Sequence, residues 1–426
     1  MPRAFGRGVF FDLLWIDLFA MTSTAFPLPG LGRLTPAVLA ALLWVTTAQA
    51  DESLRREVAQ PLQAAQDVLK ARRPEEALAL LAPLRSRADL TDAERGLLDR
   101  TTASAALQAR QFALAVPAFE SLLQRPDLAE TERRAFVQSL VNASINLKDY
   151  SRAARWALVG WQAGGPEVAR FRQVRLQALG MLGQHAELVA EARKAQSEAG
   201  SPALNEAELR ALGASQLKLK DEGGYYQTLL QLLQQSTTLD GSRDYWADLL
   251  PRVTQQPGFN NRLELDVYRL YEATGNLEDA AEFSSFAGLA MKAGLPAEAS
   301  RVLALGAERR VLVDATAQAQ LAQARNRAAE DERALAALRE NARQGNDWAQ
   351  LGDLLGSAQQ WPQAVEAYEK ALGLGALRRP EEVRLHYGRS LIGAGRKAQA
   401  REVLGALAGD GLMLAQLWLL YAQQTP

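Results

Sequence analysis

The chain has no cysteine and only two histidines, His185 and His386, among its 426 residues. Without cysteine there is no disulfide bond, no thiolate metal ligand and no thiol nucleophile. Two histidines without further ligands argue against a histidine-rich metal centre, so each is expected to be a structural or surface residue. The H-E-x-x-H motif of zinc peptidases and the G-x-S-x-G motif of serine hydrolases are also absent from the sequence. These absences favour a protein that is not an enzyme and needs no metal or cofactor.

An excess of either charge is missing as well. The chain has 48 Lys+Arg against 49 Asp+Glu, which gives a formal net charge of −1. A protein that binds the phosphate backbone of nucleic acid needs a surplus of cations, so no nucleic-acid partner is expected. Apolar residues make up 48% of the chain, enough for a large core. At this length two or three domains, or one long array of repeats, are expected.

One apolar run near the N-terminus has the flanks of an export signal. Residues 36–47 form the run, Arg33 supplies the positive flank, and the AQA ending at Ala50 is the small-x-small pattern that a signal peptidase accepts. A membrane span needs roughly 20 apolar residues, so this run is too short. The pattern predicts a cleaved signal and a mature chain without a stable membrane span. The alternative is an apolar helix that stays attached, and a second apolar stretch upstream favours Met21 over Met1 as the true start.

The rest of the chain carries a repeat, which is clearest in DWAQLGDLLGSAQQWPQAVEAYEKAL, residues 347–372. Trp348 and Gly352 fit the W-x2-L-G spacing of a first helix, and Ala364 and Tyr368 fit the A-x3-aromatic spacing of a second helix. This pattern resembles the tetratricopeptide repeat (TPR). Small residues are needed where the two helices of a pair cross closely, and large rings fill the gaps between neighbouring pairs.

The same register can be followed along the chain. The intervals from Ala77 to Ala115 and from Ala115 to Ala153 are both 38 residues, slightly above the usual TPR period of about 34. Leu188 is a departure because it is larger. The positions assigned to the repeat are Ala77, Ala115, Ala153, Ala280, Ala299, Trp348, Gly352, Ala364, Tyr368, Gly388 and Ala400. Tight turns with positive φ are expected before the second helices, at Gly183, Gly275, Gly294 and Gly395.

These observations predict an all-α fold, a TPR-like α-solenoid in which antiparallel helix pairs stack into a right-handed superhelix. The expected organisation is a signal region at 1–50, an N-terminal array at 51–220, an irregular joint at 221–261 and a C-terminal array at 262–426. A stretch with weak repeat marks, 306–345, is either an eroded repeat or a long helix pair.

Aromatic residues gather at and after the predicted joint, and they are the best candidates for a partner-binding surface. A solenoid offers an extended concave face, and aromatic side chains often anchor interfaces. The alternative is that the rings fill core space where the repeat geometry changes. The candidate partner-binding residues are Tyr225, Tyr226, Trp246, Tyr268 and Tyr271.

Two further patterns in the sequence bear on function. Arginines recur on successive helices of the N-terminal array and form either a basic strip for an acidic partner or a solvated face paired with acids; they are Arg133, Arg134, Arg152, Arg155, Arg170, Arg172 and Arg175. Ser215 opens an S-x-x-K pattern, but the S-D-N and K-T-G partners of penicillin-recognising enzymes are absent. No catalytic residue is therefore expected.

The block RLELDVYRLYEATGNLEDAAEFSSFAGLAMKAGLPAEASRVLALG, residues 262–306, is more particular than a general repeat. It is similar to exported TPR proteins of Gram-negative bacteria that are associated with TonB-type energy-transduction systems. The resemblance implies a periplasmic, non-enzymatic scaffold that binds a protein or peptide partner, with components of the TonB complex as candidates. The alternative is an adaptor in envelope assembly or exopolysaccharide export.

Overall fold

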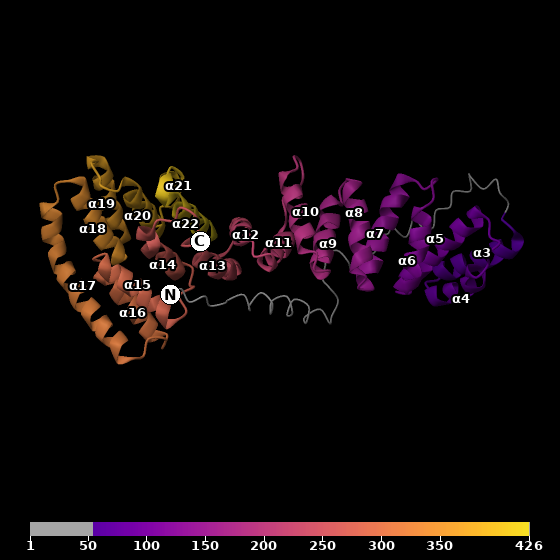
Figure 1. Cartoon of the computed structure of the whole chain (residues 1–426), viewed down its shortest axis with the longest axis horizontal. Helices are drawn as coiled ribbons and strands as arrows, with labels where there is room; N and C mark the ends of the chain where they lie inside the picture. Colours follow the sequence, from indigo (N-terminus) through magenta and orange to yellow (C-terminus); the bar gives the residue numbers. More distant parts are fainter. Residues whose placement is uncertain (1–53, 426) are drawn as a thin grey trace. The chain divides into compact units, whose positions relative to one another are not determined.

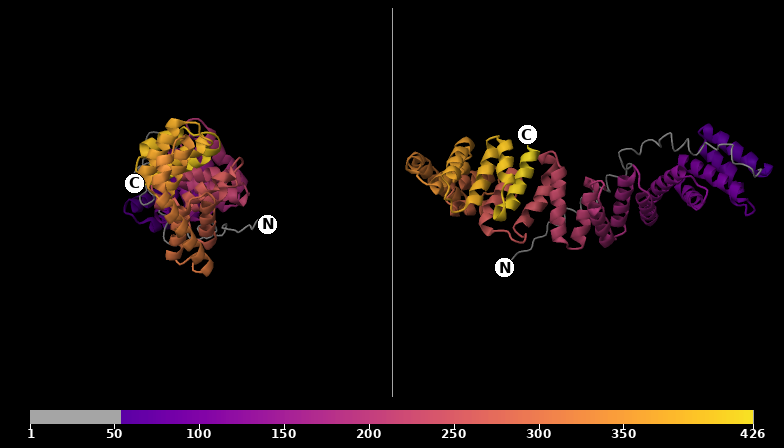
Figure 2. Two further views of the ribbon diagram at one scale, coloured as in Figure 1. Left: turned by 90° about the vertical axis from the view of Figure 1, so that its left-hand side faces the viewer. Right: turned by 90° about the horizontal axis from the view of Figure 1, so that it is seen from above.

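The computed structural model describes residues 54–425, and every regular element in that range is helical. There are twenty α-helices, α3 to α22, and two short 3₁₀ helices, with no strand in the described range. The ribbons in Figure 1 and Figure 2 show the same arrangement of coils without arrows. The predicted all-α fold of helix pairs is therefore confirmed. The predicted signal region, 1–50, lies outside the described residues.

The described residues divide into two units between Asp221 and Glu222, each with its own packing. The described part of the first unit has the rings of Phe119 and Phe136 in its core, 5.6 Å apart and at most 1% exposed. Its helices are α3 (Arg56–Lys70), α4 (Pro74–Arg85), α5 (Asp92–Gln108), α6 (Phe112–Leu123), α7 (Glu130–Asn146), α8 (Tyr150–Gln162), α9 (Val168–Met181), α10 (His185–Ser197) and α11 (Glu206–Lys218).

The second unit begins with two regular helices where an irregular joint was expected. The predicted joint, 221–261, contains α12 and α13, and both pack within the second unit, which begins one residue after the predicted joint does. The helices of this unit are α12 (Glu222–Gln235), α13 (Leu239–Val253), η2 (Asn261–Leu263), α14 (Glu264–Ala273), α15 (Ala280–Lys292), α16 (Pro296–Glu308), α17 (Ala315–Asn341), α18 (Gly345–Ser357), α19 (Trp361–Leu374), α20 (Pro380–Gly393), α21 (Lys397–Gly405), η3 (Gly409–Gly411) and α22 (Leu412–Gln424).

The stretch 306–345 contains one long helix, α17, rather than an eroded repeat or a pair. Asp314 caps its N-terminus by accepting a hydrogen bond from the backbone N–H of Ala317, at 2.8 Å. From there the sequence is rich in Ala, Gln, Arg and Glu, with no Gly or Pro to end the helix. Only Ala317 and Ala324 are buried, so α17 contributes little to the core.

One type of turn recurs at ten connections between helices, in both units. A residue with positive φ follows the first helix, and the next backbone N–H donates to a carbonyl five residues earlier, as from Gln111 to Ala106 at 2.8 Å. This is the Schellman ending, which satisfies free carbonyls and reverses the chain at once. The residues with positive φ are Arg72, Arg110, Lys148, Gly183, Lys220, Gly275, Gly294, Arg310, Gln359 and Gly395. All four predicted glycine turns are therefore present, and six further turns use residues with a side chain.

The repeat register matches the fourth residue of a helix in seven places, and it fails at Ala280. Ala280 is the first residue of α15 and is exposed, whereas the fourth residue, Phe283, is 0% exposed. The cause is a capping box in which Asp279 and Glu282 bond each other's backbone N–H, which fixes the helix start at 280. The seven fourth residues that are 0% exposed are Ala77, Ala115, Ala153, Leu188, Ala299, Ala364 and Ala400.

Two glycines of the repeat lie where helices cross too closely for a side chain. A Cβ atom on Gly352 would lie 2.6 Å from the ring of Tyr368, and one on Gly388 would lie 2.4 Å from Leu404. Trp348 lies under a cation, with the ammonium nitrogen of Lys370 4.4 Å from its ring centroid. These contacts hold α18 against α19 and α20 against α21.

We expect opposite effects from adding the same methyl group at two glycines of one helix hairpin. Gly288 is exposed inside α15 with open space at its Cβ position, so Gly288→Ala should raise the free energy of unfolding by about 0.5–1 kcal/mol. Gly294 has φ of +75°, so Gly294→Ala should lower it by about 1–2 kcal/mol. Urea unfolding followed by circular dichroism measures both, and shifts in the same direction would contradict the turn assignment.

Candidate functional site

Four of the five aromatic side chains predicted to bind a partner lie inside the second unit. Tyr225, Tyr226, Trp246 and Tyr271 are 1%, 3%, 0% and 8% exposed. Tyr268 is partly exposed, and its ring stacks on that of Tyr271 with centroids 5.6 Å apart. These rings fill core space between α12, α13, α14 and α15. The partner-binding role of the five stays a prediction, in which Tyr268 offers the largest accessible surface.

The C-terminal helix joins the beginning of the second unit. Gln424 is 4% exposed, and its amide oxygen accepts hydrogen bonds from the Ser242 hydroxyl and the Trp246 indole N–H, both at 2.8 Å. Its amide nitrogen donates to the carbonyl of Leu233, also at 2.8 Å. Helix α22 also packs against α14 and α20. The two ends of this unit therefore meet, and Figure 1 shows the C-terminus beside α13.

A network of buried charges links α14, α16, α18 and α20. Arg269 on α14 donates to Glu298 on α16 at 2.8 Å and to Asp266 at 2.8 Å. His386 on α20 lies 3.3 Å from Asp266 and 2.7 Å from Asp353 on α18. Asp266 and Arg269 are each 3% exposed and Glu298 is 0% exposed. Arg389 also donates to Glu298, at 3.1 Å, and the Tyr368 hydroxyl donates to Asp353 at 2.7 Å.

The partners in this network set one another's protonation. Burial alone would lower the pKa of His386, but the carboxylates of Asp266 and Asp353 raise that pKa to about 10. Burial alone would raise the pKa of Asp266, but the charges of His386 and Arg269 hold that pKa well below its usual range. The pKa of Glu298 is likewise lowered, because Arg269 and Arg389 outweigh its burial. His386 is therefore a cation at neutral pH and cannot serve as a general base.

The network acts as an internal link rather than as a reactive site. Removing one partner of a buried pair leaves an uncompensated charge, so the four helices must keep one register to satisfy all members. From the sequence, His386 was expected to be a structural or surface residue; the structure places it inside the network with two carboxylate partners. The signal that could have found its partners is the i, i+3 pair of Asp266 and Arg269 on one helix face.

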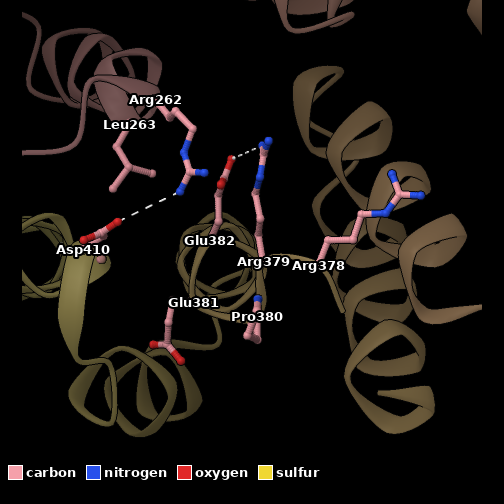
Figure 3. A pocket seen from close by; sticks show the side chains of 9 residues that line it. Arg262, Leu263, Arg378, Arg379, Pro380, Glu381, Glu382 and Asp410 are labelled. Carbon is pink, nitrogen blue, oxygen red and sulfur yellow. Dashed lines mark ion pairs between the residues drawn. The ribbon is translucent and has the colours of Figure 1, made fainter. Parts of the chain in front are cut away.

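A shallow hollow of about 220 Å³ opens between η2, the connection before α20, and η3. Figure 3 shows Arg262 facing Asp410, with the paired atoms 4.0 Å apart, and Arg379 facing Glu382, at 3.6 Å. The side chains of Arg262, Arg379 and Asp410 are more than half exposed. Small-molecule sites usually enclose about 300–1,000 Å³ with fixed polar groups. The hollow is smaller than such a site, and its charged side chains are largely exposed.

In the first unit, the structure brings Ser215 and His185 together. The Ser215 hydroxyl on α11 lies 3.1 Å from Nδ1 of His185 on α10. Ser215 is 1% exposed, so a substrate could not reach it. Among the described residues, no carboxylate hydrogen-bonds the His185 ring to orient it as a base. The pair therefore ties two helices together, and the S-x-x-K pattern has no catalytic setting.

The seven arginines of the predicted basic strip all have partners. Arg172 and Glu208 form a pair at 2.7 Å with both side chains 0% exposed, and Arg175 pairs with Glu191 at 2.7 Å. Arg133 donates to the carbonyl of Leu123 at 2.9 Å. The remaining four bind acids or an amide on their own or neighbouring helices: Arg134 with Glu130, Arg152 and Arg155 with Glu120, and Arg170 with Asn142. The strip is therefore occupied internally, and two of its members are buried rather than solvated.

Neighbouring helices α7 and α9 present a different polar surface, which we call the amide stripe. It consists of Gln138 and Asn142 on α7 with Gln173 and Gln177 on α9, all partly exposed. Arg170 donates to Asn142 at 3.2 Å, and Asn205, at the start of α11, donates to Gln173 at 3.1 Å. Each amide side chain can both donate and accept hydrogen bonds. The stripe therefore offers groups that match a peptide backbone across successive helix pairs.

Two further observations concern residues 54–425. No helix in this range is long and apolar enough to cross a membrane. The same residues contain no group of three or more His, Asp or Glu side chains that could hold a metal ion.

The pKa of His386 predicts a pH-dependent stability. Its pKa in the folded state, about 10, lies above the unfolded value of about 6.5. The stabilisation by protonated His386 is therefore complete below about pH 6.5 and is lost as the pH rises towards 10. As the pH rises from about 6.5 to about 10, the difference in unfolding free energy between wild type and His386→Gln should therefore shrink by a few kcal/mol, as a pKa shift of this size implies. Urea unfolding of both proteins across this pH range measures the difference.

Histidine-selective NMR reads the same group directly, because the chain has only two histidines. One imidazole signal should stay in its protonated position until about pH 10 and disappear in His386→Gln. His185→Gln is the matched control and should leave that signal in place. A signal from His386 that titrates near pH 6.5 would show that the network does not hold the proton.

Comparison with known proteins finds likeness only among solved structures. No protein-family model matches the chain, and no curated protein matches it. The Cut9–Hcn1 hetero-tetramer of APC/C is 11% identical, with 76% of this chain and 67% of that chain covered and a TM-score of 0.26. The Rap conjugation gene regulator of plasmid pLS20, in complex with the Phr* peptide, is 13% identical, with 82% and 98% covered and a TM-score of 0.22. The maize pentatricopeptide repeat protein PPR10 is 15% identical, with 96% and 61% covered and a TM-score of 0.26.

Proposed function

We propose that this protein is a non-enzymatic scaffold that binds an extended segment of a partner protein along the amide stripe of its first unit. The observation that carries the proposal is the row of partly exposed amides across α7 and α9, two of which, Gln138 and Gln177, have no hydrogen-bond partner among the described residues. The backbone of an extended peptide has one hydrogen-bond donor and one acceptor per residue. Amide side chains can both donate and accept, so they can pair with either backbone group.

The second unit has a supporting role in this proposal. Its charged residues on α14, α16, α18 and α20 already satisfy one another, and Gln424 closes its two ends. A partner that entered there would have to break buried ion pairs, each costly to separate. Binding to the first unit requires no ion pair to be broken, because Gln138 and Gln177 are partly exposed and have free hydrogen-bonding groups.

We further propose that the mature protein works in the periplasm, beside a TonB-type energy-transduction system. The export-type run before Ala50 and the resemblance of residues 262–306 to exported TPR proteins support this. An adaptor in envelope assembly or exopolysaccharide export is the second candidate, and it rests on the same export signal. The identity of the bound partner separates the two.

A pair of substitutions in the amide stripe should weaken partner binding without harming the fold. Gln138→Ala with Gln177→Ala removes two sites for hydrogen bonds worth about 0.5–1.5 kcal/mol each, so affinity should fall by about tenfold. A photo-crosslinking residue at position 177, used in intact cells, identifies the partner, and the purified pair gives the affinity. Gln162→Ala, on the exposed end of α8, is the matched control and should bind like wild type.

The outcome also separates the two candidate surfaces. If Tyr268→Ala abolishes binding while the double glutamine variant binds normally, the amide stripe is not the binding surface. Crosslinks to TonB-complex components favour the scaffold of a TonB-type system. Crosslinks to a polysaccharide synthase or export pore favour the adaptor in envelope assembly or exopolysaccharide export.

Cleavage of the signal can be tested apart from binding. In a Gram-negative host, the full-length gene should yield a periplasmic protein whose N-terminus is Asp51, because the AQA pattern ends at Ala50. N-terminal sequencing of the osmotic-shock fraction measures this. A protein that keeps residues 1–50 and stays with the cytoplasm would contradict the proposed location while leaving the scaffold proposal standing.

A further inference from the structure

Four turns of the first unit place a cation where the backbone favours glycine. Arg72, Arg110, Lys148 and Lys220, which we call the turn cations, have φ between 55° and 59°. The fifth equivalent turn has Gly183, with φ of 71°. A side chain in this left-handed region is strained, whereas glycine adopts it freely. The chain therefore tolerates strain at four of five turns and holds a long basic side chain there.

The turn cations are exposed and have no ion pair among the described residues. Three acids close to them in sequence are engaged elsewhere: Asp67 pairs with Lys70, Asp149 with Arg152 and Asp221 with Arg193. Glu75, three residues from Arg72, is exposed and forms no ion pair with it. The four turn cations are therefore available to an acidic ligand, although the whole chain is nearly neutral.

Exposed leucines occur at three of the five turns of the first unit, two of which carry turn cations, whereas Ala71 and Ala109 precede Arg72 and Arg110. Leu147, Leu182 and Leu219 each directly precede a residue with positive φ, and they are 39%, 40% and 45% exposed. The second unit lacks this pattern at its five turns of the same type, where the residues before the positive-φ position are Thr274, Ala293, Arg309, Ala358 and Ala394. At three of these five turns the positive-φ residue is a glycine: Gly275, Gly294 or Gly395. The edge of cations and leucines is thus confined to the first unit.

The spacing of the turns limits what can bind them. The first helices α3 and α5, and α9 and α11, pack side by side. Arg100 links α5 to Glu132 on α7, and Arg170 links α9 to Asn142 on α7. Packed helices lie about 8–10 Å apart. An extended chain advances about 3.3 Å per residue. One turn therefore corresponds to roughly three residues of an extended ligand. A flexible peptide ligand can follow such a row of turns along a solenoid. A flat lipid surface could contact all of the turns only if they lay in one plane.

We propose that the turn cations and the adjacent leucines bind an extended acidic protein segment, with Asp or Glu at about every third residue and apolar side chains between them. This surface lies at the helix ends, apart from the amide stripe on the helix faces, so it is a second docking site of the scaffold. The acids pair with the cations one turn at a time, and the apolar side chains cover the leucines.

Glycine substitutions give a test in which loss of folding cannot imitate loss of binding. The variant Arg72→Gly, Arg110→Gly, Lys148→Gly and Lys220→Gly removes the charges and relaxes the backbone, so its urea midpoint should rise. Arg310→Gly with Gln359→Gly relaxes two turns of the second unit, with φ of 57° and 58°, and is the matched control. It should also raise the midpoint but leave binding unchanged.

The probe is a fluorescent peptide of about fifteen residues with glutamate at every third position and leucine and serine between, as three residues per turn require. A second peptide has the same composition with its glutamates clustered at one end. Fluorescence anisotropy with the full chain should show tighter binding of the first peptide, weakening with salt because exposed charges are screened. The four-glycine variant should bind it at least tenfold more weakly.

Three results would overturn the proposal. The first is equal binding of the two peptides, and the second is unchanged affinity in the four-glycine variant. The third is binding to phosphatidylglycerol vesicles, lost in that variant, with no binding of either peptide, which would assign the edge to an anionic lipid surface instead. Because the amide stripe is intact in every variant, its partner should still be captured whichever result is obtained.

Discussion

The whole architecture depends on the left-handed turn that ends one helix and starts the next. At each of these turns, a backbone N–H bonds a carbonyl five residues back, as from Asn276 to Tyr271 at 2.8 Å. The bond closes the end of the first helix and sends the chain back along it. The fourth residue of the next helix then lies against the first helix, which is why it is small or fully buried at seven positions from Ala77 to Ala400. Neither helix can bury its apolar face alone, so neighbouring pairs must stack.

Both units are built with this left-handed turn, but they differ in which polar groups are buried in pairs and which stay exposed. In the first unit, buried pairs such as Arg172 with Glu208 join neighbouring helices, and the exposed faces keep free amides. In the second unit, His386 and Arg269 connect four helices through three carboxylates, and Gln424 joins the last helix to the first two. Buried charges demand a fixed register, so the second unit is held by its own interior.

The repeat is irregular where local features, such as a capping box or an uninterrupted helical sequence, override the spacing of small residues. The capping box of Asp279 and Glu282 moves the start of α15, so Phe283 rather than a small residue takes the buried position. Helix α17 continues for 27 residues because nothing in its sequence stops it. The region predicted to be an irregular joint contains α12 and α13, whose aromatic side chains are core residues of the second unit.

Local chemistry in the sequence was sufficient for the helices, the glycine turns, the close crossing at Gly352 and the absence of catalytic motifs, since each depends on residues a few positions apart. The amide stripe, the pair of Ser215 with His185 and the charge network could not be predicted, because each joins residues that are distant in the chain. The separation is 28 residues for Arg170 and Asn142, 30 for His185 and Ser215, and 120 for Asp266 and His386. Arg72 and Lys148 were missed as turn residues because only the folded backbone shows their positive φ. The sequence by itself determined that the chain folds into short reversing helices, with glycine at four of the turns. Only the tertiary structure decided which charges are buried and which remain free, because burial depends on stacking between pairs distant in the chain.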